Sequence, residues 1–152
     1  MPAIGVMILF NAPIQFEDHT KRAVKMACEM RNTIGALTQK WRNRGHSLGF
    51  GMGIALGYAT LGQIGFEQRL EYAAIGSVTN LASRLCDEAG AGQIVASRRV
   101  YGAVEQWVDA KPLDDLQLKG FNRPVLAVEI LRWREEVDNV VDAAAASARR
   151  RK

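Results

Sequence analysis

The chain has 152 residues, a length typical of one domain with a substantial hydrophobic core. Its 48% hydrophobic and 24% charged residues are ordinary for a globular protein. The excess of 20 basic over 16 acidic residues is carried by residues 149–152, so the rest of the chain is near neutral, which argues against a nucleic-acid-binding surface spread over the body.

The cysteines and the hydrophobic segments favour a cytoplasmic protein. Cys28 and Cys86 do not form a metal-binding or redox motif, and Cys28 falls in an apolar helical stripe, where a buried, reduced thiol is usual. No apolar run reaches the length of a membrane span, and no charged and then apolar leader opens the chain. The basic end at residues 149–152 is predicted to be solvated.

The first two predicted elements are a strand and a long helix. Val6 to Phe10 form a continuous apolar run closed by a proline-containing turn, which predicts a buried strand. Asp18 is a candidate N-cap for the helix that follows, and Gly45 ends it. The apolar stripe of this helix advances by three and four residues and predicts core packing for Ala23, Met26, Ala27, Met30, Ile34, Leu37 and Trp41.

Two strands joined by a glycine turn are predicted over residues 48–56 and 59–64. Gly49, Gly51 and Gly53 alternate in the first strand and therefore lie on one of its faces. A neighbouring backbone or a ligand can approach closely there. No helix opens directly after these glycines, so they do not form a dinucleotide-binding fingerprint.

The remaining predicted elements alternate between strands and helices. They are strands at residues 70–75, 93–96, 115–118 and 125–131, and helices at residues 77–88 and 99–107. Helices interleaved with hairpin-connected strands indicate an α+β fold. The predicted domain covers residues 1–134, and the Ala- and Arg-rich segment of residues 135–152 is predicted to be a flexible tail.

A polar pair stands out on the predicted helix of residues 77–88. Asn80 and Arg84 are four residues apart, so their side chains project from one face and can converge on one ligand. An amide and a planar guanidinium on a rigid element suit a phosphate that gains negative charge. On these residues alone, a solvated arginine on an N-capped surface helix is the more common explanation.

Three further motifs surround this pair in sequence order. They are the apolar run of residues 6–13, the glycine-containing strand pair of residues 53–65, and the Leu-Lys-Gly-Phe-Asn-Arg-Pro-Val stretch of residues 118–125. Together with the Asn-x-x-x-Arg helix, they resemble the catalytic domain of bacterial class III adenylate and guanylate cyclases. The resemblance runs from about Gly5 to Leu131 and implies a domain that is incomplete at its N-terminus.

This resemblance implies a ferredoxin-like core, a mixed sheet covered by helices, that lacks its first strands. In the family, two catalytic domains meet head to tail and bind a nucleoside triphosphate between them. One chain holds two divalent cations, Mg²⁺ or Mn²⁺, through two Asp residues, and the other supplies the Asn and the Arg. Here Asn80 would orient the ribose, Arg84 would stabilise charge on the α-phosphate, and Ala73 and Lys119 would be substrate-binding positions.

The sequence departs from the family pattern on the metal side. Ile4 occupies the position of a metal-binding Asp, and isoleucine has no oxygen to offer a divalent cation. The second Asp and a purine-contacting Lys would lie upstream of Met1. Ala73 replaces the usual Asp or Thr at the other purine position, which leaves ATP or GTP open. Ser77 stands where many members have Asp and is expected to act as an N-cap.

Three functions remain open from the sequence. The first is a cyclase domain that forms cyclic AMP or cyclic GMP for intracellular signal transduction in the intact protein. The second is a degenerate, inactive cyclase homology domain that dimerises and binds nucleotide in a regulatory role. The third, an RNA-binding ferredoxin-like domain, is disfavoured because the strands lack an exposed aromatic ladder.

The expected partners are ATP or GTP and either a second copy of this chain or another cyclase-domain chain. Residues 63–75 correspond to the dimer-facing segment of the family. Loss of the first strand is expected to leave unpaired backbone at the sheet, which would favour dimers or soluble aggregates.

Overall fold

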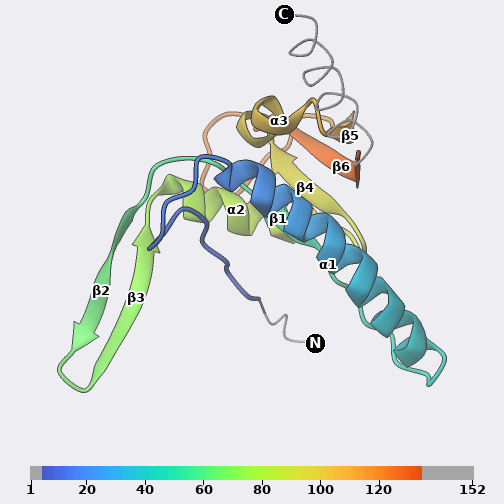
Figure 1. The fold of residues 1–152 in the computed structure, drawn as a ribbon, viewed down its shortest axis with the longest axis horizontal. Coiled ribbons are helices and arrows are strands. Elements are labelled where there is room, and N and C mark those ends of the chain that lie inside the picture. Colours follow the sequence, from blue (N-terminus) through green and yellow to red (C-terminus); the bar gives the residue numbers. More distant parts are fainter. Residues whose placement is uncertain (1–4, 135–152) are drawn as a thin grey trace, which may run out of the picture.

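The computed structural model describes residues 5–134 and shows an α+β architecture, as predicted (Figure 1). The helices among these residues are α1 (His19–Arg42), α2 (Ser77–Glu88) and α3 (Arg98–Val104). The strands are β1 (Met52–Ile54), β2 (Thr60–Phe66), β3 (Arg69–Ile75), β4 (Ile94–Ser97), β5 (Val108–Pro112) and β6 (Ala127–Trp133). The predicted tail of residues 135–152 and Ile4 lie outside the described residues.

The main sheet has the strand order β1-β4-β6-β5, and β2 and β3 form a separate antiparallel hairpin. β1 runs parallel to β4, with Gly53 opposite Val95, whereas β4 pairs antiparallel to β6 and β6 antiparallel to β5. Among the described residues, β1 has a strand on one side only, so its other side is an edge of the sheet.

The core has one cluster on each face of the main sheet, because successive residues of a strand point to opposite faces. On one face, Ile94 and Ala96 of β4 pack with residues of α1 and α3. On the other face, Val95 packs with Leu85 of α2 and with Leu118. Helices α1 and α3 therefore cover one side of the sheet, and α2 covers the other.

Helix α2 lies against β1 with almost no space between the two backbones. A Cβ atom placed on Gly53 would lie 2.3 Å from the backbone nitrogen of Cys86 and 2.4 Å from the carbonyl oxygen of Ala82. A Cβ atom on Gly51 would lie 2.9 Å from the carbonyl oxygen of Ala89. The predicted close approach at these glycines is confirmed, and the approaching group is the backbone of α2.

Helix α1 is anchored mainly by its N-terminal part, up to Arg31. Its buried residues are Val24, Ala27 and Cys28, and Arg31 donates hydrogen bonds to the carbonyl oxygens of Ile130 at 2.9 Å and Leu131 at 2.7 Å. The predicted core stripe is wrong for Leu37 and Trp41, because this end of α1 projects past the sheet (Figure 1). Leu37 and Trp41 there are 48% and 46% exposed.

Two further predictions near α1 need correction. Asp18 is at the N-cap position, but its carboxylate makes no capping hydrogen bond; it accepts one from Nε of Arg22 at 2.8 Å instead. The buried strand predicted for Val6 to Phe10 is also wrong. This segment forms no strand, and Val6 and Met7 are 85% and 55% exposed. The backbone N–H and C=O groups of a buried strand need a neighbouring strand as hydrogen-bond partner, and no described strand pairs with this segment.

The strand predictions differ in their outcome. β2, β3, β4 and β6 lie close to their predicted positions, but the long strand of residues 48–56 is reduced to β1, which pairs with β4 instead of β2. Residues 115–118 make only an isolated bridge, between Leu116 and Val125. The sequence analysis missed β5, although its short alternating Val-Asp-Ala-Lys pattern is the signal of a half-buried strand.

The contact between Gly53 and α2 can be tested with two matched glycines in strands. Gly53→Ala forces the backbones of β1 and α2 apart and is expected to lower the free energy of unfolding by about 3 kcal/mol, or to prevent folding. A Cβ atom at Gly62 in β2 would meet nothing within 4 Å, so Gly62→Ala should change stability by less than about 1 kcal/mol. Urea unfolding of both variants measures the difference. Equal stabilities would contradict the packing described here.

Candidate functional site

Helix α2 begins directly after the β2–β3 hairpin. Its N-cap residue is Gly76, so the prediction of an N-cap role for Ser77 is wrong, and Ser77 is the first helical residue. The hydroxyl of Thr79 donates a hydrogen bond of 2.8 Å to the carbonyl oxygen of Gly76, and the Thr79 amide bonds to the same oxygen at 3.2 Å. These bonds close the first turn of α2.

The structure brings Asn80 and Arg84 together on α2, as the spacing predicts. They are one turn apart, a rise of about 6 Å along the helix axis. Leu81 and Leu85, the residues that follow each of them, belong to the core cluster beneath α2. Asn80 is exposed and the side chain of Arg84 is 39% exposed, so both polar groups are accessible from solvent.

Arg84 has an acidic neighbour that the sequence analysis did not consider as its partner. Its Nη1 atom lies 3.3 Å from Oδ2 of Asp87, three residues further along the helix. The i, i+3 spacing in the sequence was the available signal. The Asp87 side chain is 64% exposed, and ion pairs of this kind contribute at most about 1 kcal/mol. A phosphate with several charged oxygens can therefore compete with Asp87 for the guanidinium.

The other two predicted substrate positions lie on neighbouring elements. Ala73 is half-buried in β3, where it pairs with Gly62 of β2. Lys119 is exposed in a turn directly after Leu118, and Leu118 shares a core cluster with Leu85 of α2. The base of this turn is thus packed on the same core as α2. The substrate-binding roles of Ala73 and Lys119 remain predictions.

The β2–β3 hairpin extends from the start of α2, away from the main sheet (Figure 1). Its side chains include four large apolar groups that are exposed to solvent: Leu61, Ile64, Tyr72 and Ile75, at 39%, 48%, 53% and 58%. A two-stranded hairpin is only marginally stable by itself in water. By the register of the hairpin, Ile64 and Ile75 lie on one face, and Leu61 and Tyr72 lie on the other. Large exposed apolar groups on such an element are typical of a surface that binds another protein.

The described residues do not contain the ligands of a metal site. Among them, no three His, Cys, Asp or Glu side chains are grouped so that they could hold an ion. The described side chains therefore do not fit Mg²⁺ or Mn²⁺, because these cations bind through grouped carboxylate oxygens.

Two titratable side chains elsewhere in the fold have shifted pKa values. Burial raises the pKa of the Cys28 thiol, in agreement with the predicted buried, reduced cysteine. A hydrogen bond from Arg132 lowers the pKa of the Asp109 carboxyl group, and the charge of Arg134 acts in the same direction. Arg132 of β6 and Asp109 of β5 face each other across paired strands, so the Asp109 carboxyl group belongs to the sheet and not to the candidate site.

A sequence model described as the adenylate and guanylate cyclase catalytic domain matches residues 5–131. The chain belongs to this family. The predicted resemblance is therefore confirmed. Adenylate cyclase 1 of Rhizobium meliloti (strain 1021) is 29% identical to this chain over 119 residues, which are 76% of the chain and 18% of that protein.

Solved structures of cyclase domains share the fold. The adenylyl cyclase CyaB of P. aeruginosa matches with a TM-score of 0.72 and 30% identity, over 83% of this chain and 66% of that one. The guanylyl cyclase Cya2 matches with a TM-score of 0.73 and 29% identity, over 83% of this chain and 64% of that one. The cyclase-type α+β fold is thus confirmed, and the chain spans just under two thirds of these domains. No helix in the part of the chain that the structure describes is long and apolar enough to cross a membrane.

Stability measurements test whether Asn80 and Arg84 are accessible groups or, like Leu85, part of the core. Asn80→Ala and Arg84→Ala remove solvent-accessible groups and are expected to lower the free energy of unfolding by less than about 1 kcal/mol each. Leu85→Ala, at a fully buried neighbour, should lower it by about 3 kcal/mol. Thermal or urea unfolding measures all three. A loss at Arg84 as large as that at Leu85 would show that Arg84 has a structural role.

Proposed function

We propose that this domain supplies one half of a nucleotidyl cyclase site. In this proposal, α2 presents Asn80 and Arg84 to ATP or GTP bound between two cyclase domains, and the product is cyclic AMP or cyclic GMP for signalling in the cytoplasm. The observation that supports it best is the accessible Asn80 and Arg84 pair on a helix that is packed backbone to backbone on the sheet. Such a helix holds the two groups in place before the substrate arrives.

The proposed reaction forms one bond and breaks one. The ribose 3′-oxygen bonds to the α-phosphorus, the bond from that phosphorus to the bridging oxygen of the β-phosphate breaks, and pyrophosphate leaves. The proton of the 3′-hydroxyl is transferred to a base. Asn80 would hold the ribose by hydrogen bonds, so that the attacking oxygen is in line. Arg84 would donate to the oxygens of the α-phosphate, where negative charge increases in the transition state.

The exchange of partners at Arg84 is part of this proposal. Without substrate, Asp87 holds the guanidinium at 3.3 Å on the surface of α2. A triphosphate carries more charge than one carboxylate and accepts two parallel hydrogen bonds from a guanidinium, so it should displace Asp87. Lys119, exposed in the turn after Leu118, would bind the same substrate, and Ala73 would form part of its binding surface.

The other half of the site would come from a second polypeptide. Because the described residues do not fit a divalent cation, the proposal assigns the metal-holding carboxylates to a partner cyclase-domain chain. The same observation favours a second candidate function, a catalytically inactive module that dimerises and binds nucleotide. A complementation experiment distinguishes the two.

We expect the 152-residue chain alone to make no measurable cyclic nucleotide from ATP or GTP with Mn²⁺. Mixed with a cyclase-domain chain that keeps its metal-binding Asp residues but lacks its own Asn and Arg, it should restore activity. Such a mixed dimer contains one site with both halves. Arg84→Ala in this chain should then lower activity by roughly two to three orders of magnitude, the loss expected for one preorganised donor.

Two controls belong to this experiment. Arg98→Ala removes an exposed arginine on α3, which covers the sheet face opposite α2, and should leave the restored activity unchanged. Cross-linking must show that mixed dimers form. If they form and remain inactive, the half-site proposal is wrong and the inactive module is favoured.

The hairpin gives a separate prediction about association. Burial of its exposed apolar groups should drive dimer formation, so light scattering of the chain at tens of micromolar is expected to show a homodimer. Ile64→Glu places a charge on the hairpin and should shift the chain toward monomer. Leu126→Glu adds the same charge at a residue that is 52% exposed outside the hairpin, and should not. A stable monomer for the unmodified chain would contradict this interface.

A further inference from the structure

The second half of α1 carries a concentration of positive charge that the proposed function does not use. From residue 30 to residue 66 the sequence contains no Asp or Glu. Arg31 lies in this region, but its guanidinium is bonded to carbonyl groups of β6. Three exposed cations remain at the end of α1: Lys40, Arg42 and Arg44.

Apolar side chains accompany these cations. Leu37 and Trp41 are 48% and 46% exposed, and all residues from 35 to 47 except Thr38 are exposed. At 3.6 residues per turn, Lys40 and Arg42 lie roughly 100° to either side of Trp41. The apolar stripe is therefore flanked by positive charge on both sides. Figure 1 shows this end of α1 extending away from the sheet and the other helices.

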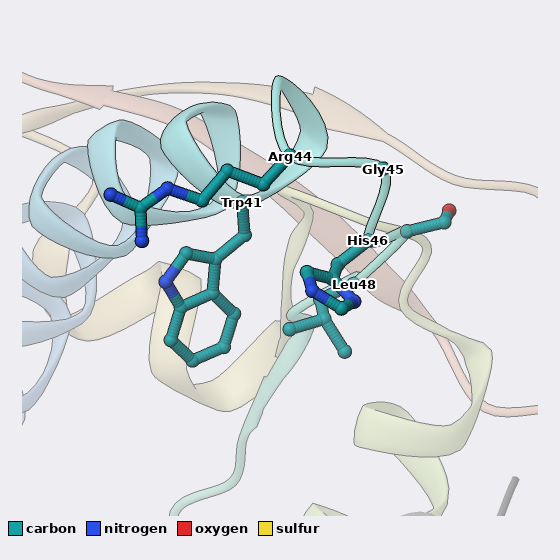
Figure 2. A pocket seen from close by; sticks show the side chains of 6 residues that line it. Trp41, Arg44, Gly45, His46 and Leu48 are labelled. Carbon is teal, nitrogen blue, oxygen red and sulfur yellow. The ribbon is translucent and has the colours of Figure 1, made fainter.

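The chain turns back at this end and leaves a shallow hollow. The hollow has a volume of about 590 Å³ and is lined by Trp41, residues 44–47 and Leu48 (Figure 2). The indole ring of Trp41, the imidazole of His46 and the side chain of Leu48 lie around it, and the side chain of Arg44 extends beside Trp41. Aromatic, aliphatic and cationic groups are thus presented together, on the opposite half of α1 from its buried anchor.

We propose that the end of α1, defined here as residues 37–48, binds peripherally to an anionic lipid surface. Leu37 and Trp41 would enter the boundary between headgroups and acyl chains, where amphipathic indole rings are favoured. Lys40, Arg42 and Arg44 would remain at the level of the negatively charged headgroups, with their apolar stems along the stripe. This binding is independent of the proposed catalytic role of α2.

Charge and shape favour a lipid surface over an acidic protein. A membrane is flat and carries diffuse negative charge, so it suits cations on both flanks of a helix end that projects from the body. The anchored half of α1 keeps its own contacts, because Val24, Ala27 and Cys28 are buried in the core. Binding therefore requires no rearrangement of the fold.

Sedimentation with lipid vesicles tests this proposal on the full chain. We expect binding to vesicles of phosphatidylcholine and phosphatidylserine in equal parts, and much weaker binding to phosphatidylcholine alone. Each cation near such a surface contributes roughly fivefold to the partition coefficient, so Lys40→Gln combined with Arg44→Gln should lower it roughly 25-fold. The matched control, Arg149→Gln combined with Arg150→Gln, removes two cations outside residues 37–48. Because the proposal places only residues 37–48 at the headgroups, this control should lower the partition coefficient by less than about threefold.

Tryptophan fluorescence provides a second measurement. Vesicles should shift the emission to shorter wavelength, and Trp41→Phe should abolish the shift. A variant with both Trp107→Phe and Trp133→Phe should keep it, because these two rings are half-buried elsewhere.

Three results would overturn the proposal. The first is no binding to the anionic vesicles, and the second is binding that depends on Arg149 and Arg150 but not on Lys40 and Arg44. The third is a Trp41 shift that appears without vesicles as protein concentration rises, which would assign this surface to a second copy of the chain.

Discussion

The close contact between α2 and β1 determines where the candidate catalytic groups lie. Only glycine fits at position 53, because any side chain would overlap the backbone of α2 at Cys86 and Ala82. The start of α2 is confined in a similar way, since a Cβ atom on Gly76 would lie 3.0 Å from the carbonyl oxygen of Tyr58. Small residues at both ends thus set the distance and the direction of this helix. Its buried residue Leu85 then completes the core beneath it.

This constraint links the fold to the proposed chemistry. A helix held by its backbone cannot shift without breaking the packing of the sheet, so in the proposed reaction Asn80 and Arg84 would keep their position as charge develops on a phosphate. Preorganised donors of this kind stabilise a transition state more than donors that must first be ordered. The surface ion pair with Asp87 is weak enough to be exchanged for substrate. The hairpin leads directly into α2 and carries exposed apolar groups, so a partner chain that binds the hairpin in the proposed complex would lie near the start of this helix.

The sequence predicted the parts of the fold that depend on local pattern. Ser77 to Glu88 was predicted as a helix with the bounds that the structure shows, and the alternating glycines correctly indicated a close approach of backbone. Patterns that depend on a distant partner were less informative. Val6 to Phe10 has the composition of a buried strand, but burial requires a neighbouring strand that the described residues do not supply. Leu37 and Trp41 continue an apolar stripe past the end of the sheet, which no helical period can reveal. The pairing of Asn80 with Arg84 follows from spacing alone, whereas their roles rest on family resemblance.

Nuclear Overhauser effects between β1 and α2 test the central claim most directly. The position of a Cβ atom on Gly53, 2.3 Å from the Cys86 nitrogen, is taken by an α-hydrogen in the protein itself. Strong cross-peaks are therefore expected between the α-hydrogens of Gly53 and the amide hydrogen of Cys86. Their absence, in spectra that show the pairing of Gly53 with Val95 of β4, would mean that α2 is not held on β1 by this contact. The proposed placement of Asn80 and Arg84 would then lose its physical basis.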